Sequence, residues 1–366
     1  MAHNERVFKT VTVYRIGVLA GDGIGPEIIN AAVQVVKNAS CKAGVKIEWI
    51  YLPMGWEGIK QHNNPLPEVT IDALKHTHGW ILGPHDSAAY PLNHKEKRNP
   101  SGELRHSLDL YANIRPAKTM PGIKSVVKEA DLVIVRENTE GFYADRNMYS
   151  GHGEWQITKD VVVTSGVFTR KAVERIAREA FALAMQRRKK VTIVHKANVL
   201  RLSTGLFLNV CREVAEQYPE VKVDDYHIDA MAAHLVRRAA DFDVIVTENM
   251  YGDILSDLAG ELVGSLGLAP SLNANEHIAM AQAAHGSAPD IAGLNIANPT
   301  GIISSAAMLL RWLAEKHADH KLREVATTVE HALYQTLQAE VKTKDLGGHA
   351  STSEFTEAIL EKIKSM

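Results

Sequence analysis

Residues 13–51 read VYRIGVLAGDGIGPEIINAAVQVVKNASCKAGVKIEWIY. A short run rich in β-branched residues at 13–19 is followed by a longer helical pattern at 26–43 and by another short run at 45–51. Strands that alternate with helices are typical of α/β layers built on a largely parallel sheet. The stretch therefore predicts an α/β fold, and the apolar residues at 80–82 predict its next strand.

The same alternation continues through the middle of the chain. A helix is predicted at 169–185, and the last hundred residues favour helix. Further strands are predicted at 132–135, 161–164, 191–194 and 244–247. With 366 residues the chain is long enough for two domains, each with a core of its own.

Two stretches resist regular structure, residues 83–102 and residues 142–156, and both are rich in turn formers and polar groups. Loops of this length inside compact domains usually serve a function or are disordered. The first precedes a cluster of arginines. We therefore interpret it as a substrate lid rather than a linker.

Charge and cysteine content exclude several classes of protein. The chain has 41 basic and 43 acidic residues and no long basic run, so a nucleic-acid or membrane-surface partner has no electrostatic support. Cys41 and Cys211 are too few for a disulfide framework, which fits a reducing compartment. No apolar run reaches the roughly 18 residues that span a bilayer, and residues 1–14 lack the apolar core of a signal peptide. We expect a cytoplasmic protein.

Three aspartates follow strand-like runs. Asp253 and Asp257 lie four residues apart at the start of a helical pattern, so they share one helix face, and Asp229 ends the run 221–228. An acidic helix N-terminus is the ordinary explanation of the first pair. Because sites in open α/β sheets gather at the carboxyl ends of strands, the three together favour Mg²⁺ or Mn²⁺. Zinc is disfavoured because no histidine pair lies at ligand spacing beside cysteine.

Arginines supply the opposite charge. Arg105 and Arg115 precede Arg136, which directly follows an apolar strand, an unusual place for a charge unless an anion meets it. Guanidinium groups bind carboxylates bidentately, so the three predict a di- or tricarboxylic substrate. The alternative is that they pair with nearby acids, for which the sequence offers Glu103, Asp109 and Glu137.

Two further side chains could transfer protons. Lys196 follows the strand at 191–194, and Tyr143 lies seven residues beyond Arg136. A lysine near cations can have its pKa lowered enough to act as a base, and a tyrosine can return a proton. Taken singly, such residues are more often solvated or engaged in packing.

Two glycine-rich turns could meet a nucleotide. The turn at 21–27, GDGIGPE, follows a strand and opens a helix, but it is GxGxG followed by proline rather than the GxGxxG of a Rossmann domain. A tight turn with Pro26 at the first helical position is the plain alternative. The segment 285–293, HGSAPDIAG, could hold an adenosine, with Asp290 accepting the ribose hydroxyls, or could be an ordinary loop.

Taken in order, these motifs resemble the β-decarboxylating dehydrogenases, the isocitrate/isopropylmalate dehydrogenase family. The resemblance runs from GDGIGPE at 21–27 through ANIRPAK, VRENTEG, HKANVL, GDILSDL and HGSAPDIAG to DLGG at 345–348. It implies that Arg105, Arg115 and Arg136 hold the malate-like part of the substrate. It also implies that Asp253 and Asp257 of one subunit bind Mg²⁺ or Mn²⁺ with Asp229 of the other, and that Tyr143 and Lys196 are acid and base in an obligatory homodimer.

The resemblance further implies an α/β two-domain fold that is not a Rossmann domain. Residues 1–110 and 265–366 would form a large, discontinuous, cofactor-binding domain. Residues 111–264 would form a small dimerisation domain, with residues 142–156 as an intersubunit clasp. NAD is expected over NADP, and its expected contacts are His285, Gly286, Ser287, Ala288, Asp290, Ile291 and Asn298.

The substrate is expected to be set just before Arg105. Isopropylmalate enzymes usually place leucines there, but this chain has Ser101 and Gly102, and Asn99 resembles a polar position of isocitrate enzymes. We therefore expect isocitrate or a polar homologue such as homoisocitrate, with 3-isopropylmalate, tartrate or D-malate as alternatives. Gln282 stands where many relatives carry glutamate near the nicotinamide.

The motifs also bear on two other classes of function. A non-catalytic regulatory subunit would tend to lose catalytic positions, whereas Tyr143, Lys196 and the three aspartates are all present. A metal-dependent hydrolase of carboxylated substrates is disfavoured by HGSAPDIAG at 285–293. Catalysis with NAD is the favoured hypothesis.

Overall fold

The computed structural model describes residues 13–95, 98–143, 148, 151 and 153–366. The chain divides into two compact units, one made of residues 1–100 and 278–366, the other of residues 101–277. The second unit is wider than the expected 111–264 stretch, partly because β11 (Pro270–Ala274) pairs with β4 (Ala112–Lys118).

The discontinuous unit begins with the stretch that predicted the fold. Its elements are β1 (Tyr14–Leu19), α1 (Gly25–Ala43), β2 (Ile47–Tyr51), α2 (Trp56–His62), α3 (Glu68–Leu74), β3 (Gly79–Leu82), α4 (Leu92–Lys95), β12 (Ala279–Ala283), α10 (Thr300–His317), α11 (His320–Gln338) and α12 (Thr352–Ser365). Strand order is β2-β1-β3-β12, with every pair parallel. The parallel α/β layer predicted from residues 13–51 is therefore confirmed.

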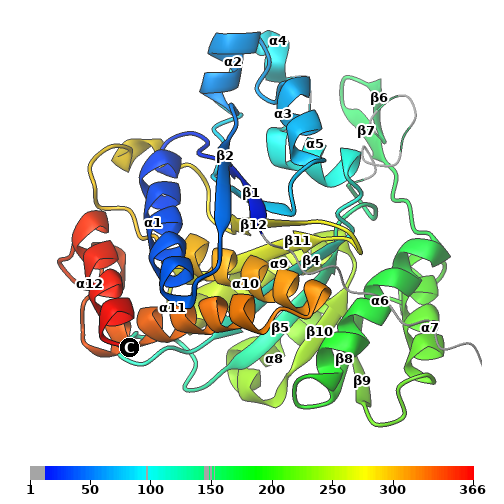
Figure 1. Cartoon of the computed structure of the whole chain (residues 1–366). Helices are drawn as coiled ribbons and strands as arrows, with labels where there is room; N and C mark the ends of the chain where they lie inside the picture. Colours follow the sequence, from blue (N-terminus) through cyan, green and yellow to red (C-terminus); the bar gives the residue numbers. More distant parts are fainter. Residues whose placement is uncertain (1–12, 96–97, 144–147, 149–150, 152) are drawn as a thin grey trace, which may run out of the picture. The chain divides into compact units, whose positions relative to one another are not determined.

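Helices pack around this sheet because its strands carry continuous apolar runs. All four residues of β3 are buried, as are all five of β12, which is typical of strands covered on both faces. Helix α10 packs on β12 and β3, and α11 packs on α10 and on α1 (Figure 1). Helices α10, α11 and α12 agree with the prediction that the last hundred residues are mostly helical, and β11 and β12 are strands within that stretch.

The other unit contains the motifs with carboxylates and arginines. After α5 (Pro100–Ser107) its elements are β4, β5 (Asp131–Glu137), β6 (Glu154–Thr158), β7 (Val161–Thr164), α6 (Arg170–Met185), β8 (Lys190–His195), α7 (Ser203–Ala215), β9 (Lys222–His227), α8 (Ile228–Arg238), β10 (Val244–Thr247), α9 (Asn249–Val263) and β11. The strand order is β11-β4-β5-β10-β8-β9. β4 runs antiparallel to both neighbours, and the pairs from β5 to β9 are parallel.

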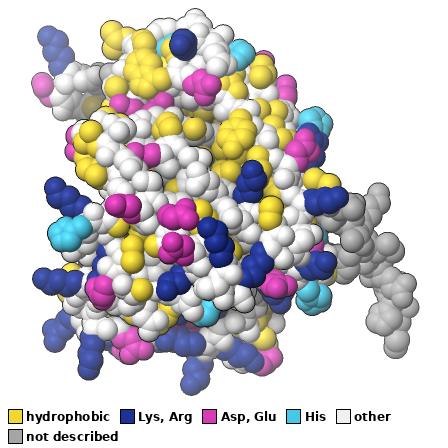
Figure 2. All heavy atoms as spheres, turned by 60° about the vertical axis from the view of Figure 1, so that its left-hand side comes forward, with side chains coloured by type: hydrophobic (Ala, Val, Ile, Leu, Met, Phe, Trp, Pro, Cys, Tyr) yellow, Lys and Arg dark blue, Asp and Glu magenta, His cyan; other side chains and the backbone are white. Residues whose placement is uncertain are grey.

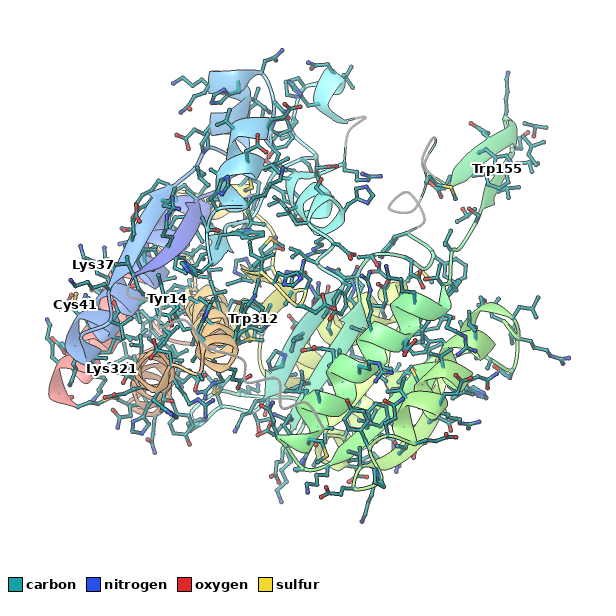
Figure 3. All side chains as sticks on the ribbon, turned by 45° about the vertical axis from the view of Figure 1, so that its right-hand side comes forward. Tyr14, Lys37, Cys41, Trp155, Trp312 and Lys321 are labelled. Atoms are coloured by element: carbon teal, nitrogen blue, oxygen red, sulfur yellow. The ribbon has the colours of Figure 1, made fainter. Side chains whose placement is uncertain are left out.

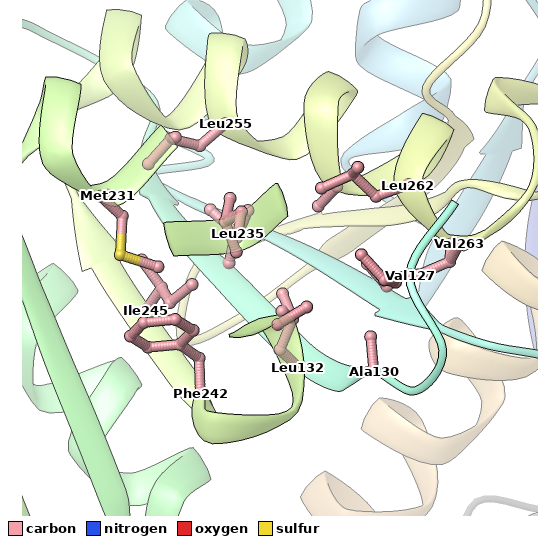
Figure 4. Close-up of a cluster of buried hydrophobic side chains, with 14 of the residues drawn as sticks. Val127, Ala130, Leu132, Met231, Leu235, Phe242, Ile245, Leu255, Leu262 and Val263 are labelled. Atoms are coloured by element: carbon pink, nitrogen blue, oxygen red, sulfur yellow. The ribbon is translucent and has the colours of Figure 1, made fainter. Parts of the chain in front are cut away.

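One apolar core fixes α8 and α9 against this sheet. Figure 4 shows Met231 and Leu235 of α8 beside Leu255 and Leu262 of α9, with Ile245 of β10 in the same cluster. All five side chains are buried. The helix that carries the candidate metal ligands is therefore held rigidly against its strands.

Strands β6 and β7 form a separate antiparallel pair. Trp155 on β6 is half exposed and is labelled beside this ribbon in Figure 3. Ile157 and Val162 are exposed as well. The expected clasp at 142–156 overlaps β6, but residues 144–147, 149–150 and 152 lie outside the described part of the chain.

Candidate active site

Helix α9 begins directly after β10 and brings the two aspartates of its motif to one end of the sheet. The Glu248 carboxylate caps this helix by accepting hydrogen bonds from the backbone N–H groups of Met250 and Tyr251, each 3.0 Å long. Asp253 and Asp257 follow one turn apart, with side chains 36% and 53% exposed. The helix therefore holds two partly exposed carboxylates on one face, while its apolar side chains such as Leu255 and Leu262 are buried.

Arg136 reaches this helix from β5. Its side chain is 2% exposed, its Nε and Nη2 donate to Asn249 Oδ1 at 2.9 and 2.7 Å, and its Nη1 donates to Asp253. A Cβ at position 252 would lie 2.5 Å from the Arg136 Cγ, so Gly252 is needed for the guanidinium to pass the helix. The glycine of the GDILSDL motif is thus explained by the arginine.

Arg115 lies on the neighbouring strand β4 and is also buried. Its Nη1 donates to Ser256 Oγ at 2.8 Å and to Asp257 at 3.2 Å, and it lies 3.5 Å from Asp253. Its Nε donates to Asn113 Oδ1 at 2.7 Å. The predicted charges at Arg115, Arg136, Asp253 and Asp257 are therefore brought together.

Arg115 and Arg136 do not pair with Asp109 or Glu137, the alternative that the sequence offered. Asp109 pairs with Arg175, at 2.6 Å, rather than with Arg115 or Arg136. Glu137 accepts hydrogen bonds from Thr139 and from the backbone N–H of Glu140. The two buried arginines instead face the aspartates of α9.

Opposed effects set the pKa values of these aspartates. Burial alone would raise the pKa of Asp253, but Arg136 and Arg115 lower it below its usual range, with smaller contributions from Tyr143 and Arg105. Burial raises the pKa of Asp257, although Arg115 opposes the shift. Burial likewise lowers the pKa of Arg115 to about 10. The arginines thus keep Asp253 ionised, whereas burial dominates at Asp257.

Tyr143 belongs to the same cluster. Its hydroxyl donates to Asp253 Oδ2 at 3.2 Å, and the Arg136 guanidinium lies 5.9 Å from the centre of its ring. A phenol held beside a carboxylate and a guanidinium is placed to exchange a proton with a bound molecule.

Lys196 and Asp229 lie at the ends of β8 and β9 and form an ion pair with each other. Their side chains are 24% and 69% exposed. Among the described residues no group of three histidine, cysteine, aspartate or glutamate side chains could hold a metal ion. Within one chain Asp229 therefore does not complete a three-carboxylate site.

The donor set nevertheless fits a hard divalent cation. Asp253 and Asp257 lie one helical turn apart, and Asp257 is more than half exposed. Mg²⁺ and Mn²⁺ are commonly bound through one or two protein carboxylates and take other oxygens from water and substrate. Two such oxygens on a rigid helix are consistent with this mode of binding.

The predicted specificity residues lie at the start of α5. Ser101 is buried in the first turn and lies four residues before Arg105, so the two share a helix face. Asn99 precedes the helix and is exposed. The interpretation of residues 83–102 as a lid stays a prediction.

The glycine turn at 21–27 supports two loops of its own unit, a role that the sequence did not indicate. Asp22 is buried and accepts hydrogen bonds from the backbone N–H groups of Trp56 and Asp86, at 2.8 and 2.9 Å, and from the Tyr90 hydroxyl. A Cβ at Gly23 would lie 2.0 Å from the Ser287 carbonyl oxygen. The glycine permits close packing against the candidate nucleotide loop.

The candidate nucleotide loop, residues 285–298, contains polar groups that a ligand could contact. The Nε2 atom of His285 is buried and has no hydrogen-bond partner among the residues that the structure describes, and burial lowers the pKa of this ring. Asp290 is exposed on a short turn of 3₁₀-helix at Pro289–Ile291. Asn298 donates to Asp345 at 2.9 Å. A buried nitrogen and an exposed carboxylate in one loop fit a polar ligand such as a nucleoside.

The proton of Glu248 gives a testable pH dependence. Burial raises the pKa of this carboxyl from 4.5 to about 7 although two N–H groups and Arg136 oppose it. The folded protein therefore keeps a proton that the unfolded chain loses, so this stabilisation is present below pH 4.5 and is lost as pH rises to about 7. Between pH 5.5 and 8 the wild type should lose about 2 kcal/mol of unfolding free energy relative to Glu248→Gln.

Urea unfolding of both proteins at the two pH values measures this difference. Glu354→Gln is the matched control, because Glu354 caps α12, is exposed and has a lowered pKa. Its own contribution is lost only as pH falls toward the acid range. An equal pH response of the wild type and Glu248→Gln would show that Glu248 stays ionised in the folded protein.

Surface charge and the apolar character of the helices are two further features of the described residues. Figure 2 shows basic and acidic side chains interspersed on one face of the molecule. Among the helices of the described residues, none has the length and apolar character needed to cross a bilayer.

Comparison with known proteins agrees with this geometry. The family model described as isocitrate/isopropylmalate dehydrogenase matches residues 15–359. The chain is 44% identical to an isocitrate/homoisocitrate dehydrogenase of Thermus thermophilus, and the match covers 96% of this chain and 99% of the relative. It is 42% identical to a 3-isopropylmalate/3-methylmalate dehydrogenase of Methanocaldococcus jannaschii, with the same coverage of 96% and 99%.

A solved structure shows the same fold. The crystal structure of isocitrate dehydrogenase from Methylococcus capsulatus matches with a TM-score of 0.86 at 38% identity, covering 96% of this chain and 99% of that one. The predicted α/β fold and the resemblance are confirmed. The chain belongs to the isocitrate/isopropylmalate dehydrogenase family and is an oxidoreductase of the β-decarboxylating class.

Proposed function

We propose that the protein oxidises isocitrate, or a polar homologue such as homoisocitrate, with NAD and then releases a carboxylate as carbon dioxide. The observation that carries this proposal is the cluster of Arg115, Arg136, Tyr143, Asp253 and Asp257. Its charges and hydrogen-bonding groups suit a substrate with several carboxylates and a hydroxyl.

The arginines would hold and orient the substrate. Arg136 and Arg115 are fixed by Asn249, Asn113 and Ser256, so their guanidinium groups are preorganised. A preorganised guanidinium loses little entropy when it binds a carboxylate. Arg105 would complete the carboxylate site from α5.

Asp253 and Asp257 would hold Mg²⁺ or Mn²⁺. When bound, the cation would lower the pKa of the substrate hydroxyl and stabilise the negative charge left by decarboxylation. NAD would accept the hydride. Lys196 would take the hydroxyl proton, and Tyr143, already hydrogen-bonded to Asp253, would return a proton to carbon.

A homodimer would bring these groups together. Lys196 and Asp229 form an exposed pair at the ends of β8 and β9, whereas Tyr143, Asp253 and Asp257 lie around α9. We propose that Lys196 and Asp229 of one subunit serve the cluster of the other. The exposed apolar hairpin of β6 and β7 would contribute to the contact between subunits.

The polar start of α5 favours a polar substrate. Ser101 is buried one turn before Arg105, where isopropylmalate enzymes usually present leucine. An apolar wall is worth about 1 to 3 kcal/mol of discrimination. Purified protein with Mg²⁺ and NAD should therefore show higher kcat/KM for isocitrate or homoisocitrate than for 3-isopropylmalate, D-malate or tartrate. Highest kcat/KM for 3-isopropylmalate would contradict this choice.

Asp290 should favour NAD over NADP. Its exposed carboxylate would accept hydrogen bonds from the ribose hydroxyls of NAD and repel a 2'-phosphate. Because a hydrogen bond to a charged group is worth about 1.5 to 3 kcal/mol, Asp290→Lys should lower kcat/KM for NAD by about 10- to 100-fold. Glu324→Lys makes the same charge change on the exposed face of α11 and should leave that constant unchanged. Equal kcat/KM values for NAD in the two variants would show that Asp290 does not contact the cofactor.

A further inference from the structure

His195, the last residue of β8, makes two hydrogen bonds that fix its protonation. The ring is buried, its Nδ1 accepts the backbone N–H of Ala197 at 3.0 Å, and its Nε2 lies 3.0 Å from Asp225 Oδ1. Because a backbone N–H can only donate, Nδ1 carries no proton and Nε2–H donates to the carboxylate. Burial also lowers the pKa of His195, which favours the neutral ring.

Asp225 is itself held by a cation. Its Oδ2 accepts a hydrogen bond of 2.7 Å from Arg212 Nη2, a donor on α7. An arginine cannot accept a hydrogen bond, so this oxygen is fixed as an acceptor and Oδ1 remains for His195. The contacts form a chain that runs from Arg212 through Asp225 and His195 to the Ala197 amide.

The chain of contacts ends on the turn that carries Lys196. The Lys196 N–H donates to Thr204 Oγ1 at 3.2 Å, and its carbonyl accepts the N–H groups of Val199 and Leu200 at 3.0 and 2.9 Å. With the Ala197 amide bound to His195, the backbone is held on both sides of the lysine. The imidazole therefore fixes the backbone on the C-terminal side of Lys196.

The same contacts join the strands that carry the ion pair. His195 of β8 is the register partner of His227 on β9, and Asp225 lies two residues before His227. Asp229 follows in the first turn of α8. The bond between His195 and Asp225 thus crosslinks the two strand ends from which Lys196 and Asp229 project.

We propose that His195 is a positioning residue for Lys196, and that Asp225 selects the tautomer that lets His195 hold the Ala197 amide. The proposal rests on the proposed function, in which Lys196 is the base. In this proposal His195 acts only by orienting the lysine, through its hydrogen bond to the Ala197 amide.

Two variants at position 195 test whether a hydrogen-bond acceptor for the Ala197 N–H is needed. In His195→Asn the side-chain oxygen can still accept the Ala197 N–H, whereas His195→Leu has no acceptor. We expect His195→Asn to keep kcat within about 3-fold of the wild type, since the acceptor is retained. His195→Leu should lower kcat by about 30-fold with KM for the hydroxy acid changed less than about 3-fold, because misplacement of a catalytic group costs rate more than binding.

Asp225→Asn tests the tautomer without a change of size. The asparagine oxygen would turn toward Arg212, so its NH₂ would face His195 Nε2 and drive the ring proton to Nδ1, where it opposes the Ala197 N–H. We expect kcat to fall by about 10-fold, with KM little changed, because the wrong tautomer misorients the turn. Asp224→Asn is the matched control, since Asp224 is the neighbouring residue of β9 but pairs with Lys190 and Thr192.

Lys196→Met separates this proposal from the proposed function. If that variant keeps full activity, the role of Lys196 in the proposed function is wrong. If it is inactive while Asp225→Asn and His195→Leu keep wild-type kcat, the positioning role is overturned. Loss of kcat in His195→Asn equal to that in His195→Leu would also overturn it. Should His195→Leu fail to fold, the kcat of Asp225→Asn against Asp224→Asn decides the question.

Discussion

Replacing Lys196 by methionine should lower kcat by about a thousand-fold, within the range that loss of a general base usually costs. The same change should leave stability almost untouched. The Asp229 carboxylate, which pairs with Lys196 in the same chain, is 69% exposed, so water replaces the lost ion pair. Exposed pairs contribute about 0 to 1 kcal/mol. Steady-state kinetics and thermal unfolding of the same preparation measure both effects.

Lys196→Arg is the informative control. Arginine keeps the positive charge beside Asp229 but does not give up its proton, so it should be nearly as inactive as the methionine variant. Recovery of activity in the arginine variant would mean that position 196 supplies charge rather than a base. A wild-type kcat in Lys196→Met would show that Lys196 is not the general base.

Replacing Asp253 by asparagine should reduce both activity and stability. Asp253 faces two buried arginines, and Arg136 is only 2% exposed. Loss of one partner of a buried ion pair usually costs 3 to 5 kcal/mol, and we expect about 2 kcal/mol here because Asp253 is 36% exposed. Loss of a metal ligand should lower kcat by about a thousand-fold, since the cation stabilises developing charge by several kcal/mol.

Asp257→Asn distinguishes the loss of stability from the loss of a metal ligand. Asp257 is 53% exposed, so its loss should cost little stability while activity still falls. Mn²⁺ should raise the unfolding temperature of the wild type, because a ligand that binds only the folded state stabilises it. Neither variant should show that rise at the same Mn²⁺ concentration. A wild-type response to Mn²⁺ in Asp253→Asn would exclude that carboxylate as a ligand.

The sequence was sufficient to predict the parts of the site that follow from periodicity and strand ends. Asp253 and Asp257 share a helix face because they are four residues apart, and Arg136 follows an apolar strand. Lys196 and Asp229 each follow a predicted strand, at 191–194 and 221–228. These relations depend only on local pattern and on the rule that parallel strands end at one edge.

Other features depend on tertiary contacts that one sequence does not reveal. Asn249 and Ser256 hold the two arginines, yet nothing local distinguishes them from other polar helix residues. Strand β12 reads AMAQA and lacks β-branched side chains, so its local pattern does not identify it as a strand, and burial among parallel strands decides its state. The contacts of Asp22 likewise join segments 34 and 64 residues apart.

The central claim is that oxidation by NAD and loss of a carboxylate occur in one active site. The direct measurement is the ratio of carbon dioxide to NADH formed when the purified protein meets isocitrate, NAD and Mg²⁺, with homoisocitrate as the second substrate. We predict one carbon dioxide for each NADH and neither product when NAD is omitted. Reduction of NAD without carbon dioxide, carbon dioxide without NAD, or no turnover with either substrate would contradict the account.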